Sequence, residues 1–185
     1  MIKITLPDGS VKEFASGVTP MEVAKSISEG FARNVISASF NGTTVETTTP
    51  LTTDGSLILY TWNDEDGKKA FWHSTSHVMA QVLEQMYPGI KLTLGPAIAN
   101  GFYYDVDFEE HKITEADFKK IEDRVLEISR GKHEFKLRPV SKADALELYK
   151  DNVYKTEMIT NLEDGTITFC DHDTFTDLCR GGHIP

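Results

Sequence analysis

The sequence predicts an α+β protein with a small domain followed by a larger one. Three observations predict it: short strands around one helix in the first sixty residues, a charged polar stretch over 63–69, and amphipathic helices beyond that stretch. The 185 residues and the 39% hydrophobic content are typical of a globular chain of this organisation. The sequence contains no apolar run of transmembrane length and no signal peptide, so we expect no membrane partner.

The first sixty residues predict the order strand, strand, helix, strand, strand. Thr19-Pro20-Met21-Glu22 combines an N-cap, a proline at the first helical position and a capping-box glutamate, which together predict the start of the helix. Alternating apolar and polar residues separated by turn signals predict the strands, over residues 2–6, 11–14, 35–40 and 57–60. The region holds no catalytic constellation.

The larger domain is expected to begin after the charged stretch. We set the first domain at 1–62, the linker at 63–69 and the second domain at 70–185. The second domain should open with a helix from about Ser74 to Tyr87, ended by Pro88-Gly89, and continue with helices capped by Thr114 and Ser141. Strand candidates in this domain are residues 102–106 and 167–169.

The charge balance limits the classes of function. A formal net charge of −10 argues against a protein whose main task is to coat nucleic acid. Residues 112–155 nevertheless carry eleven Lys or Arg against nine Asp or Glu, so any RNA contact is expected there. The two cysteines, Cys170 and Cys179, form no disulfide framework, which favours a reducing cytoplasm.

His73 and His77 are the first candidate site residues. Their spacing of four places both on one face of a helix, opposite the stripe formed by Val78, Val82 and Met86. A core role is therefore disfavoured, and the pair should face solvent or a cleft. A zinc-protease site is excluded because Ser74 stands where such a motif carries its glutamate.

Cys179 and His183 form a second pair, separated by Arg180-Gly181-Gly182. The two glycines disfavour a helix, so both side chains are expected on a tight loop that turns inward. Two histidines, a cysteine and a third histidine match a tetrahedral zinc site in ligand type and number. They equally suit a metal-free hydrolytic pocket in which imidazole acts as an acid or base.

These motifs and their neighbours resemble a known family. Residues 73–106 and 176–183 resemble the editing domain of bacterial threonyl-tRNA synthetases, and residues 1–61 resemble the TGS domain, a ubiquitin-like β-grasp module. The HxxxH and CxxxH pairing is shared with alanyl-tRNA synthetases, whereas Gly95-Pro96, the run 100–105 and Lys155 match the threonyl branch. Gly182 departs from the proline that many family members carry, and we expect a more flexible loop.

The resemblance implies post-transfer editing, the hydrolysis of the ester that joins serine to the 3′ end of tRNA(Thr). It implies catalytic roles for His73, which would activate water or relay protons, and for Lys155, which would stabilise the oxyanion. The substrate-binding residues that it implies are His77, Tyr104, Asp177, Cys179 and His183.

The resemblance also implies cofactors and partners. The Lys155 and Asp177 matches favour the threonyl branch, which predicts a site without metal, the alternative being zinc held by His73, His77, Cys179 and His183. The chain is expected to be an N-terminal fragment. The ligase domain, which uses ATP with Mg and its own zinc, would lie outside it, so the fragment should not aminoacylate. The full-length enzyme is expected to be a homodimer and the fragment a monomer.

Two other functions stay open. In the first, the TGS-like domain works as an RNA-binding or regulatory module without hydrolysis. The second is a zinc-dependent, alanyl-type trans-editing hydrolase, which would cleave Ser-tRNA(Ala) rather than Ser-tRNA(Thr).

Overall fold

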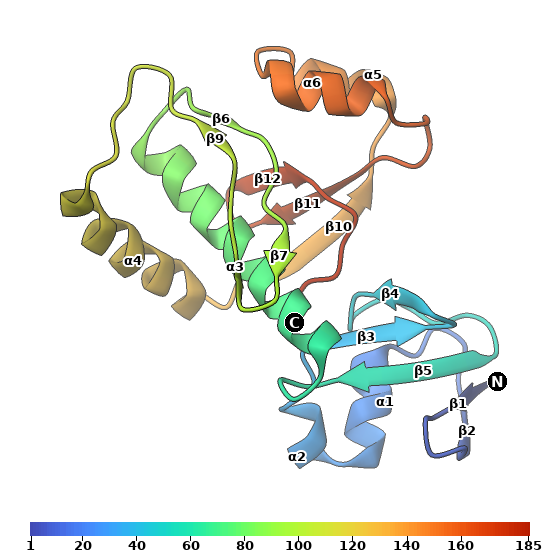
Figure 1. Ribbon diagram of the computed structural model, residues 1–185. Coiled ribbons are helices and arrows are strands. Elements are labelled where there is room, and N and C mark those ends of the chain that lie inside the picture. Colours follow the sequence, from blue (N-terminus) through green and yellow to red (C-terminus); the bar gives the residue numbers. More distant parts are fainter. The chain divides into compact units, whose positions relative to one another are not determined.

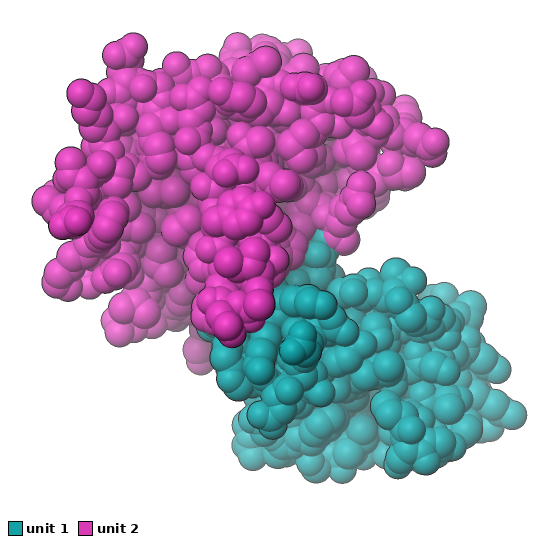
Figure 2. Space-filling view, in the orientation of Figure 1, with its two compact units in different colours: residues 1–71, 181–185 teal, residues 72–180 magenta.

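The computed structural model describes residues 1–185, which form two compact units (Figure 2). The first comprises Met1–Phe71 with Gly181–Pro185, and the second comprises Trp72–Arg180. Helices and strands occur in both, which confirms the predicted α+β class. None of the helices combines the length and the apolar character that crossing a bilayer requires.

The first unit is a five-stranded mixed sheet with helices on one face (Figure 1). The strand order is β2-β1-β5-β3-β4, with β1 and β5 parallel and the other pairs antiparallel. The core between sheet and helix includes Ile4, Ala38 and Leu57 from the strands and Val23 from α1. The elements are β1 (Ile2–Thr5), β2 (Val11–Phe14), α1 (Pro20–Ile27), α2 (Glu29–Ala32), β3 (Ser37–Phe40), β4 (Thr43–Val45) and β5 (Gly55–Tyr60).

Local sequence accounts for most of these elements. Thr19 and Glu22 form the predicted capping box at the start of α1, with Pro20 at the first helical position. Strand β4 was not expected, because it has only three residues. It pairs with β3 across Asn41 and Gly42, whose φ values of 51° and 79° are those that a two-residue hairpin turn requires.

The second unit combines helices with a three-stranded antiparallel sheet of order β10-β11-β12 (Figure 1). Two pairs of two-residue strands, β6 with β9 and β7 with β8, lie in the segment between α3 and α4. The elements are α3 (Glu65–Met86), β6 (Lys91–Leu92), β7 (Ala97–Ile98), β8 (Gly101–Phe102), β9 (Val106–Asp107), α4 (Glu115–Arg130), β10 (Phe135–Pro139), α5 (Lys142–Leu148), α6 (Val153–Thr160), β11 (Thr168–His172) and β12 (Phe175–Leu178).

Helix α3 begins at Glu65, nine residues before the expected start near Ser74. The charged residues 65–69 are therefore helical. Gly67 is required in this first turn, because a Cβ added there would collide with the carbonyl oxygen of Thr61. A charged, glycine-containing stretch thus resembles a linker in sequence but forms the start of a helix here.

The two faces of α3 have different roles. Val78 and Val82 pack with Ile128 of α4 in a buried cluster, as the apolar stripe predicted. His73 and His77 lie on the other face and line a pocket. The interpretation that the histidines lie away from the apolar stripe is confirmed.

Helices α5 and α6 and strand β10 complete the second unit. The sequence predicted only α5, with its Ser141 cap, which accepts a hydrogen bond from the Asp144 amide. Ala145 of α5, Ile159 of α6 and Phe169 of β11 share one buried cluster, which fixes the two helices against the sheet. This packing brings α6 to the same pocket as α3.

Candidate functional site

The second unit contains a cavity of about 500 Å³, a size ordinary for small-molecule sites. It is lined by residues from α3, the β6–β9 segment, α6, the segment from α6 into β11, β12 and the loop after β12. Six of the seven predicted site residues line it: His73, His77, Tyr104, Lys155, Asp177 and Cys179. These six span more than a hundred positions of the sequence.

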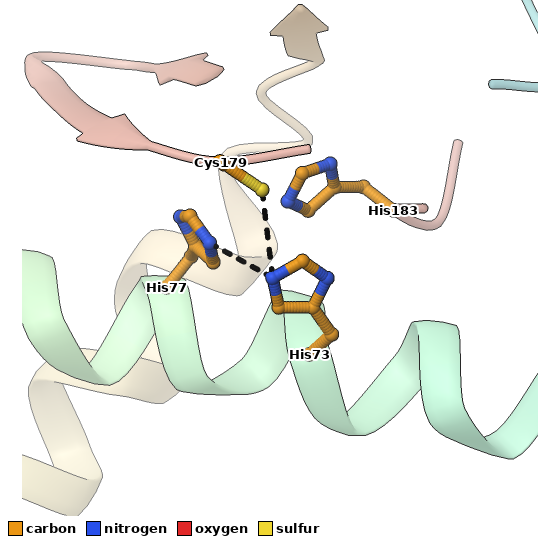
Figure 3. A group of neighbouring side chains, drawn as sticks. All are labelled: His73, His77, Cys179 and His183. Atoms are coloured by element: carbon orange, nitrogen blue, oxygen red, sulfur yellow. Dashed lines mark hydrogen bonds between the residues drawn. The ribbon is translucent and has the colours of Figure 1, made fainter. Parts of the chain in front are cut away.

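Helix α3 and the loop after β12 bring four metal-binding side chains together. The Nε2 atom of His73 lies 3.2 Å from Nε2 of His77 and 3.5 Å from Sγ of Cys179. With His183, the four donor atoms all lie within 4.8 Å of one another. Figure 3 shows the sulfur and one ring nitrogen of each histidine directed toward a common point. We call these four residues the donor cluster.

The donor cluster fits zinc in chemistry, and two of its donor distances fit a tetrahedral site. A tetrahedral zinc ion bound at about 2.1 Å from nitrogen and about 2.3 Å from sulfur holds neighbouring donors about 3.3–3.6 Å apart. The two distances measured from His73 agree with that spacing. His77, Cys179 and His183 are buried and His73 is half-buried. The prediction that this part of the chain holds no metal is therefore wrong, because the donor cluster forms a possible metal site.

The glycines between Cys179 and His183 adopt the turn that the sequence suggested. Gly181 and Gly182 have φ values of 90° and 89°, a region open to glycine and closed to proline. The carboxylate of Glu46 accepts hydrogen bonds from the amides of Gly182 and His183 at 2.9 and 3.2 Å. It also lies 3.2 Å from Nδ1 of His183. No sequence pattern around Glu46 predicted this contact.

Lys155 and Asp177 form a buried ion pair elsewhere in the pocket. Asn152 caps α6 through a hydrogen bond from the Lys155 amide to its side chain, and so fixes the helical turn that carries the lysine. Nζ of Lys155 donates to Oδ1 of Asp177 at 2.6 Å. The two residues are only 1% and 3% exposed, so their charges depend on each other and on nearby donors.

The carboxylate of Asp177 has donors on both oxygens. Oδ2 accepts from the Tyr104 hydroxyl at 2.6 Å, and Oδ1 also accepts from the Leu178 amide at 2.8 Å and the Tyr149 hydroxyl at 3.4 Å. Burial, and then the charge of Asp177, raise the pKa of Tyr104 well above its ordinary value, so this phenol remains a donor. Oδ2 has Tyr104 as its one donor, so its second lone pair could accept from a substrate amino group.

The segment before Tyr104 holds its ring in place. Ser76 of α3 donates to the Gly95 carbonyl at 2.9 Å, and a Cβ added at Gly95 would collide with the Tyr104 ring. In the sequence, Gly95-Pro96 served only as a match to the threonyl branch. The structure therefore adds Gly95 to the residues that shape the pocket. The sequence signal that could have indicated it was a glycine next to a proline.

Comparisons with known proteins relate the chain to one group of enzymes. Residues 2–61 match the family described as the TGS domain. The whole chain is 86% identical to a threonine–tRNA ligase of Flavobacterium johnsoniae and 84% identical to that of Flavobacterium psychrophilum, and it spans 28% of each. It is 51% identical to the threonine–tRNA ligase of Parabacteroides distasonis, of which it spans 29%.

Proposed function

We propose that this chain, which corresponds in sequence to the N-terminal portion of bacterial threonine–tRNA ligase, hydrolyses the ester that joins serine to the 3′ end of tRNA(Thr). The observation that carries the proposal is the pocket lined by three members of the donor cluster and by the Lys155–Asp177 pair. One cavity therefore contains metal-binding side chains and the buried ammonium of Lys155. Ester hydrolysis requires both an activated water and a group that stabilises negative charge.

The chemistry of threonine explains why such an activity is needed. Threonine and serine differ by one methyl group, and a methylene-sized contact changes binding by only about 1–3 kcal/mol. A synthetic site that accepts threonine therefore also accepts some serine. A second, hydrolytic pocket removes the product of that error.

The donor cluster would hold zinc through His73, His77, Cys179 and His183. When bound, zinc would supply Lewis acidity to the ester carbonyl if its coordination expands from four to five. His73 is the least buried of the four, and its imidazole faces the pocket, so we assign it contact with the attacking water or the ribose hydroxyls. With Nε2 bound to zinc, the ring would keep an Nδ1–H that can donate to that water or hydroxyl and help relay a proton there.

Lys155 is assigned to the developing oxyanion. A positive charge in a site with little water stabilises negative charge far more than it does in bulk solvent. Asp177 holds the ammonium at 2.6 Å and is itself held by Tyr104, so the cation is in position before the reaction begins. The roles of Tyr104 and Asp177 toward the substrate amino group remain part of the proposal.

The partner in this proposal is the 3′ end of tRNA(Thr) carrying serine. The cytoplasmic location belongs to the same proposal and is supported by two buried cysteines that form no disulfide. A homodimeric parent enzyme and a monomeric fragment stay predictions. An RNA-binding TGS module that lacks hydrolysis would leave the donor cluster and the buried pair without a use.

The test is deacylation of Ser-tRNA(Thr) beside Thr-tRNA(Thr) by this chain. We expect release of serine, retention of threonine, and loss of activity when His73→Ala is combined with Lys155→Ala. The matched control combines His111→Ala with Lys112→Ala, which removes an exposed histidine and lysine outside the pocket. Undiminished hydrolysis in the pocket variant would exclude the proposed residues, and preference for Ser-tRNA(Ala) would favour the alanyl-type alternative.

A further inference from the structure

Tyr149 contacts the buried ion pair from outside the pocket. The residue follows α5, and its ring packs edge-on against Phe169 with a centroid distance of 5.6 Å. It lines a second cavity of about 410 Å³, which also has Asp177 in its wall. Asp177 thus lines both cavities, whereas Tyr149 lines only the second of the two.

One side chain here contacts both charges of the pair. The Tyr149 hydroxyl is 3.2 Å from the Thr176 carbonyl oxygen and 3.4 Å from Oδ1 of Asp177. The ring centroid lies 5.8 Å from Nζ of Lys155, within the range of a weak cation–π contact. Because the phenol is buried, and next because Asp177 is charged, the pKa of Tyr149 is raised and its hydroxyl stays a donor.

The backbone of Tyr149 is tied to the helix that carries Lys155. Its carbonyl accepts from the Asn152 amide and from the Thr156 hydroxyl, each at 2.8 Å. Asn152 in turn caps the first turn of α6. Tyr149 is therefore connected to Lys155 twice, through the turn before α6 and through the carboxylate of Asp177.

We propose that Tyr149 is a positioning residue for the Lys155–Asp177 pair, fixing the rotation of the Asp177 carboxylate and thereby the place of the Lys155 ammonium. The catalytic part of this inference rests on the function proposed above. A lysine side chain has about four rotatable bonds, so the position of its ammonium depends on the groups that bind it. A misplacement of about 1 Å can reduce a rate about a hundredfold.

The variant Tyr149→Phe keeps the ring and removes the hydroxyl. We expect kcat for Ser-tRNA(Thr) deacylation to fall about tenfold, with KM and zinc content unchanged. The matched control is Tyr154→Phe, which removes the hydroxyl that donates to Asp107 at 2.8 Å outside the pocket. The control should keep wild-type kinetics.

A measurement independent of activity separates this inference from the proposed function. Hydrogen exchange of the Lys155 ammonium, followed by nitrogen-15 NMR and assigned by its loss in Lys155→Met, should accelerate about tenfold in Tyr149→Phe. Amide exchange at buried Ile159 of the same helix should not change. Unchanged ammonium exchange, or equal acceleration at Ile159, would overturn the positioning role. Inactive wild-type protein would overturn only the proposed hydrolysis.

Discussion

His73 and His77 reach the pocket from one face of α3, whereas Lys155 and Asp177 reach it from α6 and β12. The donor cluster brings nitrogen and sulfur atoms toward one another, an arrangement suited to a shared cation. The Lys155–Asp177 pair already contains its own cation, and its carboxylate is occupied by donors from the protein. The donor cluster is suited to take up a cation, whereas the Lys155–Asp177 pair already contains one.

This difference separates two sources of order in the pocket. Metal binding stabilises the folded state, so the order of the donor cluster should depend on metal concentration. A buried ion pair is instead held by geometry and desolvation, and the loss of one partner leaves a charge that the interior cannot solvate. Substitutions in the donor cluster should therefore lower metal affinity, whereas substitutions in the Lys155–Asp177 pair should lower the free energy of unfolding.

Lys155→Met should produce the largest effect. It leaves the Asp177 carboxylate buried without its cation, so we expect the free energy of unfolding to fall by about 3–5 kcal/mol and deacylation to be lost. Urea denaturation measures the first and tRNA deacylation the second. Exposed Lys112→Met is the control.

The double variant Lys155→Met with Asp177→Asn should recover part of that stability, because it removes both charges. Activity should stay lost. Equal destabilisation by the single and double variants would mean that the packing of Lys155, and not its charge, holds this side of the pocket.

Cys179→Ala should lower zinc affinity by at least about a hundredfold, because it removes the only sulfur ligand of the donor cluster. Chelator competition measures the affinity, and elemental analysis should find one zinc per wild-type chain. Cys170→Ala is a close control, since Cys170 is equally buried, lies on β11 and does not line the pocket. Equal zinc binding by both variants would remove Cys179 from the site.

Strong local signals explain what the sequence predicted correctly. The capping box at Thr19 and Glu22 and the proline between them mark the start of α1 within a single turn of chain. The apolar stripe on α3 depends only on helical periodicity, which is why it located His73 and His77 on the pocket side. Such features need no knowledge of distant residues.

The elements that the sequence missed lack such signals for physical reasons. Helix α6 was not recognised because Lys155 is buried where an amphipathic pattern requires an apolar residue, and long-range pairing with Asp177 permits that burial. Strand β10 is an edge strand with mostly exposed residues and a proline at its end. The metal prediction was wrong because it followed family branch markers, whereas the convergence of the donor atoms exists only in three dimensions.

Gly95→Ala tests the wall that carries Tyr104. The added methyl would collide with the Tyr104 ring, so we expect a loss of about 1–3 kcal/mol in the free energy of unfolding and displacement of the hydroxyl from Asp177. Deacylation should fall while zinc affinity stays at the wild-type value. The control is Ala97→Gly on the neighbouring strand β7. Gly165→Ala would not serve, because the positive φ of Gly165 would itself strain an alanine. A fall in zinc affinity would show that the two sides of the pocket are coupled.

Tyr104→Phe should give the smallest effect and the sharpest comparison. It removes one hydrogen bond of 2.6 Å to Asp177 while the donors from Lys155 and Leu178 remain, so we expect a loss of about 1 kcal/mol in unfolding free energy.

The carboxylate of Asp177 in Tyr104→Phe then has one oxygen open toward the pocket. If Asp177 holds the substrate amino group, KM for Ser-tRNA(Thr) should stay the same or fall as kcat decreases. A rise in KM with kcat unchanged would instead make the Tyr104 hydroxyl itself a substrate contact. Steady-state kinetics on Ser-tRNA(Thr), with Tyr87→Phe as the control for an aromatic hydroxyl outside the pocket, distinguishes the two outcomes.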